Sequence, residues 1–289
     1  MARLTSKDYW DEVHGSVQAV VPPAGRPAWR VWVKIMMKRL HADVLLGYRC
    51  DYTDFVLWET LFPTYLPKGE GLKVIEIGSA PGTSLVKFHT RFGYEPYGVE
   101  YSDVGVQVNR DTFMADGINP DNVIHADAFS DAFLSRYGSQ FDVVMSQGFI
   151  EHFSDPGAVV DMHMTLLKPG GYLVALIPNV AGINRVMACI FNRARISLHN
   201  LRIMDKKVFA KLFDRQDITR LYCDYCGMFS FGLFSTPRGS PMRHVLAACK
   251  WLQAYSSIMV RLVLRGRDPR SRTSPILVYV GRKLADTDL

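Results

Sequence analysis

A short glycine-containing turn is the first feature of the sequence that could serve chemistry. Residues 73–77 read Lys-Val-Ile-Glu-Ile, and Gly78-Ser-Ala-Pro-Gly82 follows before a helical pattern begins near Thr83. Glycines at a strand-to-helix turn let the backbone approach a ligand closely, and the helix that follows presents free N–H groups. The G-x-x-x-G spacing differs from the G-x-G-x-x-G of nicotinamide sites, and Pro81 stands where a diphosphate loop would use N–H donors.

Acidic residues stand at or just beyond the ends of the next two apolar segments. Glu100 lies 22 positions after Gly78 (100 − 78 = 22), where a carboxylate can accept both hydroxyls of a ribose. Asp127 follows the third segment and can meet the exocyclic amine of an adenine. The turn and these two acids together predict a site for a nucleoside-containing ligand.

Strands that alternate with helices must position these residues. Strands are expected at 73–77, 96–100, 122–125, 141–146 and 172–178, with helices at 83–92, 103–116, 131–137 and 156–167. Such an alternation predicts right-handed crossovers and an α/β, doubly wound, mostly parallel sheet with helices on both faces. Two closing strands at 221–234 and 274–281, with a helix at 242–264 between them, would make seven strands.

The chain divides by pattern into two domains. Residues 1–70 are predicted to form a helical N-terminal cap, in which 28–46 has the charge spacing of an amphipathic helix. Residues 71–289 form the second domain, made of a core at 72–180, a helical lid at 181–215, and the closing strands with their inserted helix at 216–289.

Composition and charge restrict the class of protein. The 289 residues are 48% hydrophobic and 21% charged, which excludes a disordered or collagen-like chain. Five irregularly spaced cysteines argue against a disulfide framework, and the N-terminus has no apolar signal-peptide segment, so a reducing, cytoplasmic setting is expected. The net charge of +6 is concentrated near the C-terminus, where residues 236–283 contain ten Arg or Lys and one acid.

Further motifs give the sequence a family resemblance. They are the acid and small residue Asp127-Ala128, the segment ending in Gln147, the string Gly148-Phe-Ile-Glu-His152, and the turn Lys168-Pro-Gly-Gly171. Together with the glycine turn, they resemble the class I S-adenosylmethionine-dependent methyltransferases, and most of all their small-molecule, type 11–12 branch. The resemblance implies a Rossmann-like fold, transferase activity and S-adenosyl-L-methionine as cofactor, with S-adenosyl-L-homocysteine as product.

The resemblance also implies roles for single residues at the cofactor. The methionine end would be lined by Glu76, Gly78, Ser79, Ala80 and Gly82. The adenosine end would be held by Glu100 at the ribose, Tyr101 beside the adenine, Asp127 at its amine, and Ala128 and Phe129 over the ring. Gln147 would lie near the sulfonium.

Two histidines are candidates for a catalytic base. A hydroxyl acceptor needs a group that takes its proton during attack, and His152, with Glu151 beside it, follows the strand that would point at the methyl group. His199, in the predicted lid, is the second candidate. The alternative for His152 is a structural role beneath the site.

The sequence also predicts whether the site binds a metal ion. Quinone-pathway relatives with a Glu-His pair can carry a further acid three positions before the Glu, forming a divalent metal site. Gly148 occupies that position here, so we predict that no catalytic metal is bound. The pair Cys223-Asp-Tyr-Cys226 has no second pair or nearby His, which argues against zinc.

The acceptor and partners remain open at this stage. The favoured reaction is O-methylation of a small molecule or a sugar hydroxyl, and a glycan is suggested by the string at 198–204. The alternatives are N- or C-methylation of a small metabolite or quinone precursor, and a regulatory protein that binds the cofactor without transfer. A nucleic acid is not favoured, because no base-amine motif or added module is visible. Residues 242–272 could contact a membrane surface, although such a helix is more typical of a core element or a homodimer contact.

Overall fold

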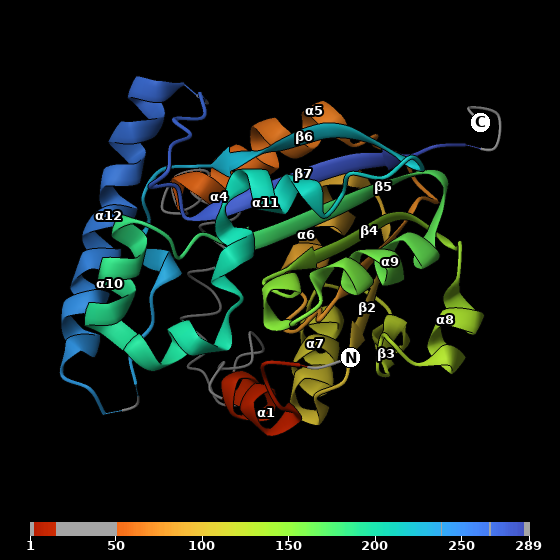
Figure 1. Ribbon diagram of the computed structural model, residues 1–289, viewed down its shortest axis with the longest axis horizontal. Coiled ribbons are helices and arrows are strands. Elements are labelled where there is room, and N and C mark those ends of the chain that lie inside the picture. The colour runs from red at the N-terminus through yellow and green to blue at the C-terminus, as the bar shows by residue number, and fades with distance from the viewer. Residues whose placement is uncertain (1–2, 16–50, 238, 266, 286–289) are drawn as a thin grey trace.

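The computed structural model describes residues 3–15, 51–237, 239–265 and 267–285 (Figure 1). The predicted amphipathic helix at 28–46 lies outside the described residues. Before the sheet begins, four helical segments lie within the described residues. They are α1 (Lys7–Gly15), α4 (Tyr52–Val56), the π-helical turn η1 (Leu57–Leu61) and α5 (Phe62–Tyr65).

In the described part of the chain, the strands form one seven-stranded sheet in the order β3-β2-β1-β4-β5-β7-β6. The strands are β1 (Lys73–Ile77), β2 (Glu95–Glu100), β3 (Val123–His125), β4 (Phe141–Gln147), β5 (Leu167–Pro178), β6 (Ile218–Cys226) and β7 (Ile276–Lys283). The pairs among β1 to β5 are parallel, while β7 runs antiparallel to both neighbours. The predicted doubly wound, mostly parallel sheet of seven strands is confirmed.

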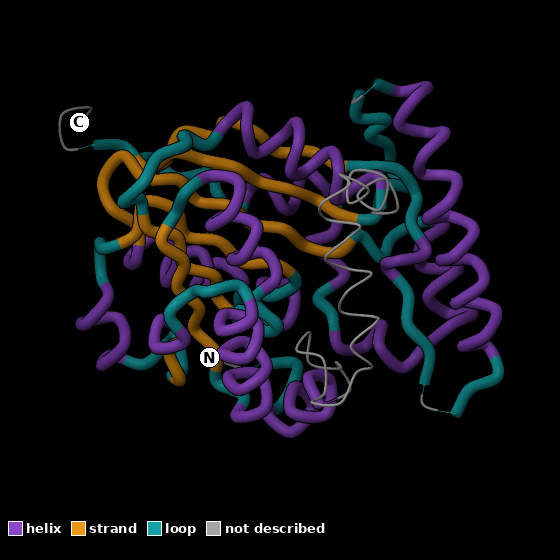
Figure 2. Tube along the Cα trace, turned by 180° about the vertical axis from the view of Figure 1, so that it is seen from behind, coloured by secondary structure: helices purple, strands orange, loops and turns teal. Residues whose placement is uncertain are grey.

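Helices cover both faces of this sheet because its central strands are apolar on both sides. Val74 and Ile75 of β1 are adjacent and both fully buried, yet they belong to different hydrophobic clusters, one on each face. The crossover helices are α6 (Thr83–Phe92), α7 (Asp103–Ala115), α8 (Asp131–Tyr137) and α9 (Pro156–Leu166). Figure 2 shows them on the two sides of the strands.

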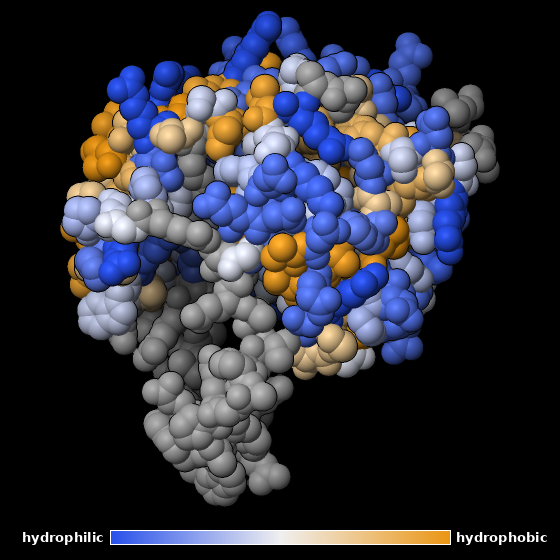
Figure 3. Space-filling model, turned by 90° about the horizontal axis from the view of Figure 1, so that it is seen from below, coloured by the Kyte–Doolittle hydropathy of each residue, from blue (hydrophilic) through white to orange (hydrophobic). Residues whose placement is uncertain are grey.

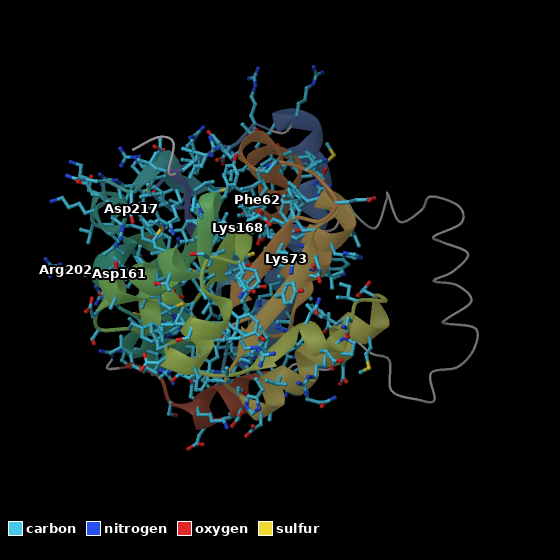
Figure 4. The ribbon with its side chains drawn as sticks, turned by 90° about the vertical axis from the view of Figure 1, so that its right-hand side faces the viewer. Phe62, Lys73, Asp161, Lys168, Arg202 and Asp217 are labelled. Carbon is cyan, nitrogen blue, oxygen red and sulfur yellow. The ribbon has the colours of Figure 1, made fainter. Side chains whose placement is uncertain are left out.

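The amino ends of the central strands are fixed by one half-buried carboxylate. Asp142 in β4 accepts a hydrogen bond from the backbone N–H of Lys73 at 2.8 Å, and its two oxygens accept from Lys168 Nζ at 2.9 and 2.8 Å. Lys73 and Lys168 flank β4 on its two sides and lie close together in Figure 4. This clamp fixes the end of the sheet opposite to the carboxyl ends of the strands, where ligands of such folds bind.

The last third of the chain differs from the prediction at one strand. β6 ends at Cys226, not near 234, because Gly227 adopts a positive φ of 81° and its N–H is held by the Asp268 carboxylate at 2.9 Å. The chain then continues through a loop and the 3₁₀ turn η6 (Phe231–Leu233). The other elements are α10 (Ile183–Asn192), η4 (Arg193–Leu198), η5 (Leu201–Met204), α11 (Lys206–Lys211) and α12 (Met242–Leu264).

The helix α12 is not a core element, which was one of the two roles favoured from the sequence, while the other, a homodimer contact, stays a prediction. It lies along one edge of the molecule beside α10 (Figure 1), and several of its large apolar side chains are exposed. None of the described helices is both long enough and apolar enough to cross a membrane.

Candidate active site

Two cavities lie at the carboxyl edge of the described sheet. The larger, of about 450 Å³, extends from the tip of β4 to the lid and is lined by Gln147, Glu151 and His199 among others. The smaller, of about 30 Å³, is lined by residues that follow β1, β2 and β3. Trp10 and His152 line both cavities and therefore form the wall between them.

The glycine turn after β1 has two different functions at its two ends. Gly78 has a φ of 70°, and a Cβ there would lie 2.9 Å from the Phe149 ring, so only glycine fits beside the small cavity. Gly82 also has a positive φ, but a Cβ there would overlap with the Asn109 side chain of α7. Gly82 and the buried Ser79, whose Oγ accepts from Asn109 Nδ2 at 2.5 Å, hold the turn against α7 and line neither cavity.

Glu76 is a buried acid directly beneath this turn. Its side chain is 5% exposed, and its Oε2 has no hydrogen-bond partner among the described residues. Burial, reinforced by the nearby charge of Glu100, raises the pKa of Glu76 to about 8. A carboxylate in this position favours a cationic group in the site above it, because a cation would offset the cost of ionisation.

Glu100 ends β2 at the edge of the small cavity and is 4% exposed. Its Oε1 accepts the backbone N–H groups of Tyr101 and Ser102, both at 2.9 Å, while its Oε2 lies 3.9 Å from His14 Nε2 of α1. Burial raises the pKa of Glu100, and hydrogen bonds from the backbone N–H groups of Ser102, Tyr101 and Ala80 oppose that rise. The carboxylate is therefore fixed in orientation by its own loop.

The N-terminal segment covers the predicted adenosine side. Arg3 donates to Asp127 Oδ2 at 2.6 Å, and its guanidinium lies over the Tyr101 ring at 4.8 Å and the Phe129 ring at 5.9 Å. Asp127 Oδ1 accepts the Phe129 N–H at 3.1 Å. Tyr101, Asp127 and Ala128, three of the residues predicted to hold the adenosine, line the small cavity, whereas Phe129 does not, and Arg3 was not foreseen there.

The predicted acid–base residues lie together at the larger cavity. His152 is 4% exposed, its Nε2 lies 3.8 Å from Glu151 Oε1, and its ring centroid lies 4.8 Å from that of His199. The lid is tied to this loop because the Asn200 N–H donates to the Glu151 carbonyl at 2.7 Å. Glu151 is 1% exposed, and burial raises its pKa to about 8.

One hydrogen bond determines which nitrogen of His152 can act as a base. Nδ1 lies 2.9 Å from the carbonyl oxygen of Leu198. A carbonyl only accepts, so we assign the proton of the neutral ring to Nδ1 and leave the lone pair on Nε2. Nε2 is the atom on the side of Glu151, so this arrangement can accept a proton near the larger cavity.

The same three side chains bear on the predicted absence of a metal. Glu151, His152 and His199 each offer one ligand atom, and these atoms lie within 4.8 Å of one another. His199 thus offers a third ligand in a site that lacks one at Gly148. The absence of a metal stays a prediction.

Sequence reasoning missed several residues of both cavities. Trp10 and His14 of α1 stack at 5.7 Å, and Trp10 also meets the His152 ring edge-on at 5.0 Å. Their i, i+4 spacing on a short amphipathic helix was a signal that α1 has a packed face. Asp51, Thr53 and Asp54 line the larger cavity, but they stand about 100 positions before the Glu-His pair and follow no recognisable motif.

The fold and the site define a class of protein. The strand order, with one antiparallel strand near the edge and a nucleoside-type site beyond the first three strands, is the architecture of class I S-adenosylmethionine-dependent methyltransferases. The sequence profile of the methyltransferase domain family matches residues 50–224, and the chain belongs to this family. Its cofactor is S-adenosylmethionine.

Curated relatives and solved structures agree with that assignment. The chain is 28% identical over 122 residues to the ubiquinone biosynthesis O-methyltransferase of Chelativorans sp. (strain BNC1), covering 42% of this chain and 44% of the relative. It is 27% identical over 121 residues to the enzyme of the same name from Caulobacter vibrioides, with the same coverage. The chain thus spans less than half the length of these curated relatives.

Among solved structures, the chain is similar to a candidate methyltransferase from Bacillus halodurans, with a TM-score of 0.51, 15% identity, and coverage of 79% of this chain and 99% of that one. It is also similar to a structure of the Haloferax volcanii Trm112 methyltransferase activator with its candidate methyltransferase, with a TM-score of 0.52, 17% identity, and coverage of 80% and 90%. At these identities the likeness concerns the fold alone.

The chemical types of the residues at the site fit S-adenosylmethionine. Glu76 is a buried carboxylate whose Oε2 has no hydrogen-bond partner among the residues described, which suits the cationic methionine end, and Gly78 leaves the turn open beside the small cavity. Glu100 and Asp127 supply acceptors for hydroxyl and amine hydrogens. When bound, the cofactor supplies an electrophilic methyl group on a sulfonium.

Proposed function

We propose that the protein methylates a hydroxyl oxygen of a small molecule or sugar, with His152 as the general base. The observation that carries this proposal is the position of His152 in the wall between the two cavities. A base for hydroxyl attack has to reach the acceptor oxygen while that oxygen faces the transferring methyl group. Only a residue at the junction of the cofactor and acceptor sites satisfies both conditions.

The proposed cofactor residues lie on both sides of the wall formed by Trp10 and His152, some at the small cavity and one at the larger cavity. Gly78, Glu100, Tyr101, Asp127 and Ala128 border the small cavity and would hold the adenosine and the adjoining chain. Gln147, at the tip of β4, borders the larger cavity, and its Oε1 accepts from Ser84 Oγ at 3.2 Å.

The larger cavity suits an acceptor with both polar and apolar parts. Leu57, Leu176 and Ile196 line it with aliphatic surface, while Asp51 and Asn192 bring polar side chains. Such a lining binds an acceptor through its apolar surface and orients it through a few hydrogen bonds. The matched relatives are named O-methyltransferases, which further supports oxygen as the methylated atom.

In the proposed reaction, His152 and its neighbours position and deprotonate the acceptor. Nε2 of His152 takes the hydroxyl proton as the oxygen attacks in line, and the Leu198 carbonyl holds the ring in the required tautomer. Glu151, whose Oε1 lies 3.8 Å from Nε2, would stabilise the imidazolium with its carboxylate charge once its own proton has passed to solvent. His199 closes over the acceptor from the lid.

The test is turnover with a methyl-labelled cofactor and a metabolite extract, followed by mass-spectrometric identification of the labelled product. His152→Ala should lower turnover by ~10²–10⁴ and leave cofactor affinity nearly unchanged. His89→Ala, on α6 and outside both cavities, is the control and should keep full turnover.

Two other outcomes would redirect the assignment. A product methylated on nitrogen or carbon would replace the hydroxyl acceptor with an amine or a carbon nucleophile. Cofactor binding without any transfer would support the regulatory alternative, in which the fold serves as a sensor of the cofactor.

A further inference from the structure

Two neighbouring helices expose stripes of aliphatic side chains. On α12, Val245, Leu252, Met259 and Val263 are 48%, 60%, 62% and 74% exposed. Their spacing of i, i+7, i+14 and i+18 puts them within about 40° of one line along a helix of 3.6 residues per turn. On α10, Ile183, Val186 and Ile190 are 48%, 53% and 54% exposed and also share one face.

The two helices are held together as one unit. Phe191 of α10 and Leu246 of α12 are both buried against Phe234, and Met187 and Met242 pack onto the same cluster. Figures 1 and 2 both show α10 and α12 side by side at one edge of the molecule, away from the helices that cover the sheet. Figure 3 shows hydrophobic side chains at that edge, with hydrophilic ones around them.

The two chain segments that contain α10 and α12 carry basic residues and no acidic ones. Residues 181–204 contain four Arg and no acid, and residues 236–267 contain six Arg or Lys and no acid. Arg185, Arg193, Arg243, Arg265 and Arg267 are exposed. A face with exposed aliphatic stripes and cations, and no acids, complements a partner that has an apolar interior beneath an anionic outer layer.

Cations on the inner side of α12 fix how the helix is turned. Lys250 Nζ donates to the Phe234 carbonyl at 2.9 Å, and the Arg261 guanidinium lies over the Phe55 ring at 4.2 Å. These contacts, with the burial of Leu246, hold the stripe of Met259 on the outer side. Trp251, a residue type that prefers membrane interfaces, is 60% exposed on the same helix.

We propose that α10 and α12 form a docking surface for an anionic lipid bilayer. The helices would lie in the plane of the interface, with their aliphatic stripes among the acyl chains and the arginines at the headgroups. A second copy of the chain fits this surface less well, because pairing two such faces would bring together two sets of arginines without an acid in either segment.

The docking surface also borders the acceptor cavity, and this step rests on the proposed function. Ala188 and Asn192 of α10 line the larger cavity, whereas Ile183, Val186 and Ile190 face outward. Because one side of α10 would face the bilayer and the other side faces the cavity, an amphiphile could move from the bilayer into the cavity along this helix. The acceptor class is therefore a hydroxyl compound whose apolar part resides in the membrane.

The experiment is co-sedimentation of the full chain with vesicles of phosphatidylcholine alone and of phosphatidylcholine with about a third phosphatidylglycerol. We expect binding to the anionic vesicles, about tenfold weaker binding to the neutral ones, and loss of binding as NaCl rises from about 0.1 to 0.5 M. Met259→Glu should weaken binding to anionic vesicles about tenfold or more. The matched control is Met114→Glu on α7, which replaces a methionine that is 55% exposed elsewhere and should leave binding unchanged.

Three results would overturn the docking surface: no vesicle binding, equal binding to neutral and anionic vesicles, or equal loss in both methionine variants. A fourth result comes from sedimentation velocity of the free protein. If the protein is a dimer and Met259→Glu converts it to monomers, the face is an interface with a second copy of the chain. Failure of the proposed function is distinguishable, because it would appear as methylation of nitrogen or carbon, or as cofactor binding without transfer, while vesicle binding remains.

Discussion

Arg3 and Asp127, which are 124 positions apart in sequence, form an ion pair of 2.6 Å across the small cavity. Asp127 is the carboxylate expected to accept the adenine amine, so the arginine and the cofactor compete for it. The small cavity, at about 30 Å³, is far smaller than the roughly 300–1,000 Å³ typical of small-molecule sites. Arg3 and its neighbours must therefore shift before an adenosine can occupy the site.

Replacing Arg3 should make cofactor binding tighter. Arg3→Gln removes the competitor for Asp127, and because an exposed ion pair contributes about 0.2–1 kcal/mol, the Kd should fall by roughly 1.5- to 5-fold. Calorimetric titration with S-adenosylhomocysteine measures it. Lys7→Gln is the matched control, since Lys7 pairs with Asp103 at 2.8 Å outside both cavities and its loss should leave the Kd unchanged. Weaker binding by Arg3→Gln would show instead that Arg3 holds the cofactor.

Loss of the Glu100 carboxylate should weaken cofactor binding by about 1–3 kcal/mol, because a charged acceptor of ribose hydroxyls is removed. Glu100→Gln is the better variant than Glu100→Ala, since the amide oxygen can still accept the N–H groups of Tyr101 and Ser102. Calorimetry gives the affinity, and a thermal melt checks that the loop is intact. An unchanged Kd in a folded Glu100→Gln protein would remove Glu100 from the site.

Stability should fall as the pH rises from about 7 to 8.5. Burial raises the pKa values of Glu76 and Glu151 from 4.5 to about 8, so the folded protein binds more protons than the unfolded chain between these values. The free energy of unfolding then falls with rising pH in this window, by up to about 1.4 kcal/mol per pH unit for each group. Buried His163, whose pKa is lowered to about 4, acts in the opposite direction, but only below pH 6.5.

Urea unfolding at pH 7 and 8.5 measures this slope. Glu76→Gln should reduce the slope, whereas Glu70→Gln, in an exposed turn, should keep it. The idea fails if the Glu76→Gln slope equals that of the parent protein. Because bound cofactor places a cation near Glu76, saturation with S-adenosylmethionine should also reduce the slope, through a lower pKa of that carboxyl.

Exhaustive chelation should leave methyl transfer unchanged. Gly148 offers no side-chain ligand, and the proposed base needs only the Nε2 lone pair of His152. Activity is measured before and after treatment with a chelator, with added Mg²⁺ and Zn²⁺ in parallel. Because Glu151, His152 and His199 lie within ligand range of one another, loss on chelation that a metal restores would establish a three-residue metal site there.

The sequence predicted the core of the fold closely, because local patterns determine it. Thr83–Phe92, Asp131–Tyr137 and Met242–Leu264 were expected as helices and have those bounds in the structure. The first of these begins after Gly82 and ends before Gly93, Ser130 caps the start of the second, and the third begins after Pro241. The predicted end of β6 was wrong, because the strand's true end depends on the long-range hydrogen bond between Gly227 and Asp268 and not on the apolar residues of 227–234.

The candidate site was predictable only where residues follow the strands of the core. Glu100, Asp127 and His152 were found because the carboxyl ends of parallel strands must meet. Arg3 and Trp10 could not be found in this way, since their place depends on how α1 packs against α7 and on contacts between residues more than 100 positions apart. The inward turn of Ser79 and Gly82 toward Asn109 was likewise set by helix packing.

The shared wall of Trp10 and His152 has a kinetic consequence. If adenosine displaces Trp10, the same displacement reshapes the chamber that receives the acceptor, so occupancy of one chamber changes the affinity of the other. Thermodynamic linkage makes this coupling reciprocal. In steady-state kinetics the KM for each substrate should therefore depend on the concentration of the other, and Trp10→Ala should reduce that dependence.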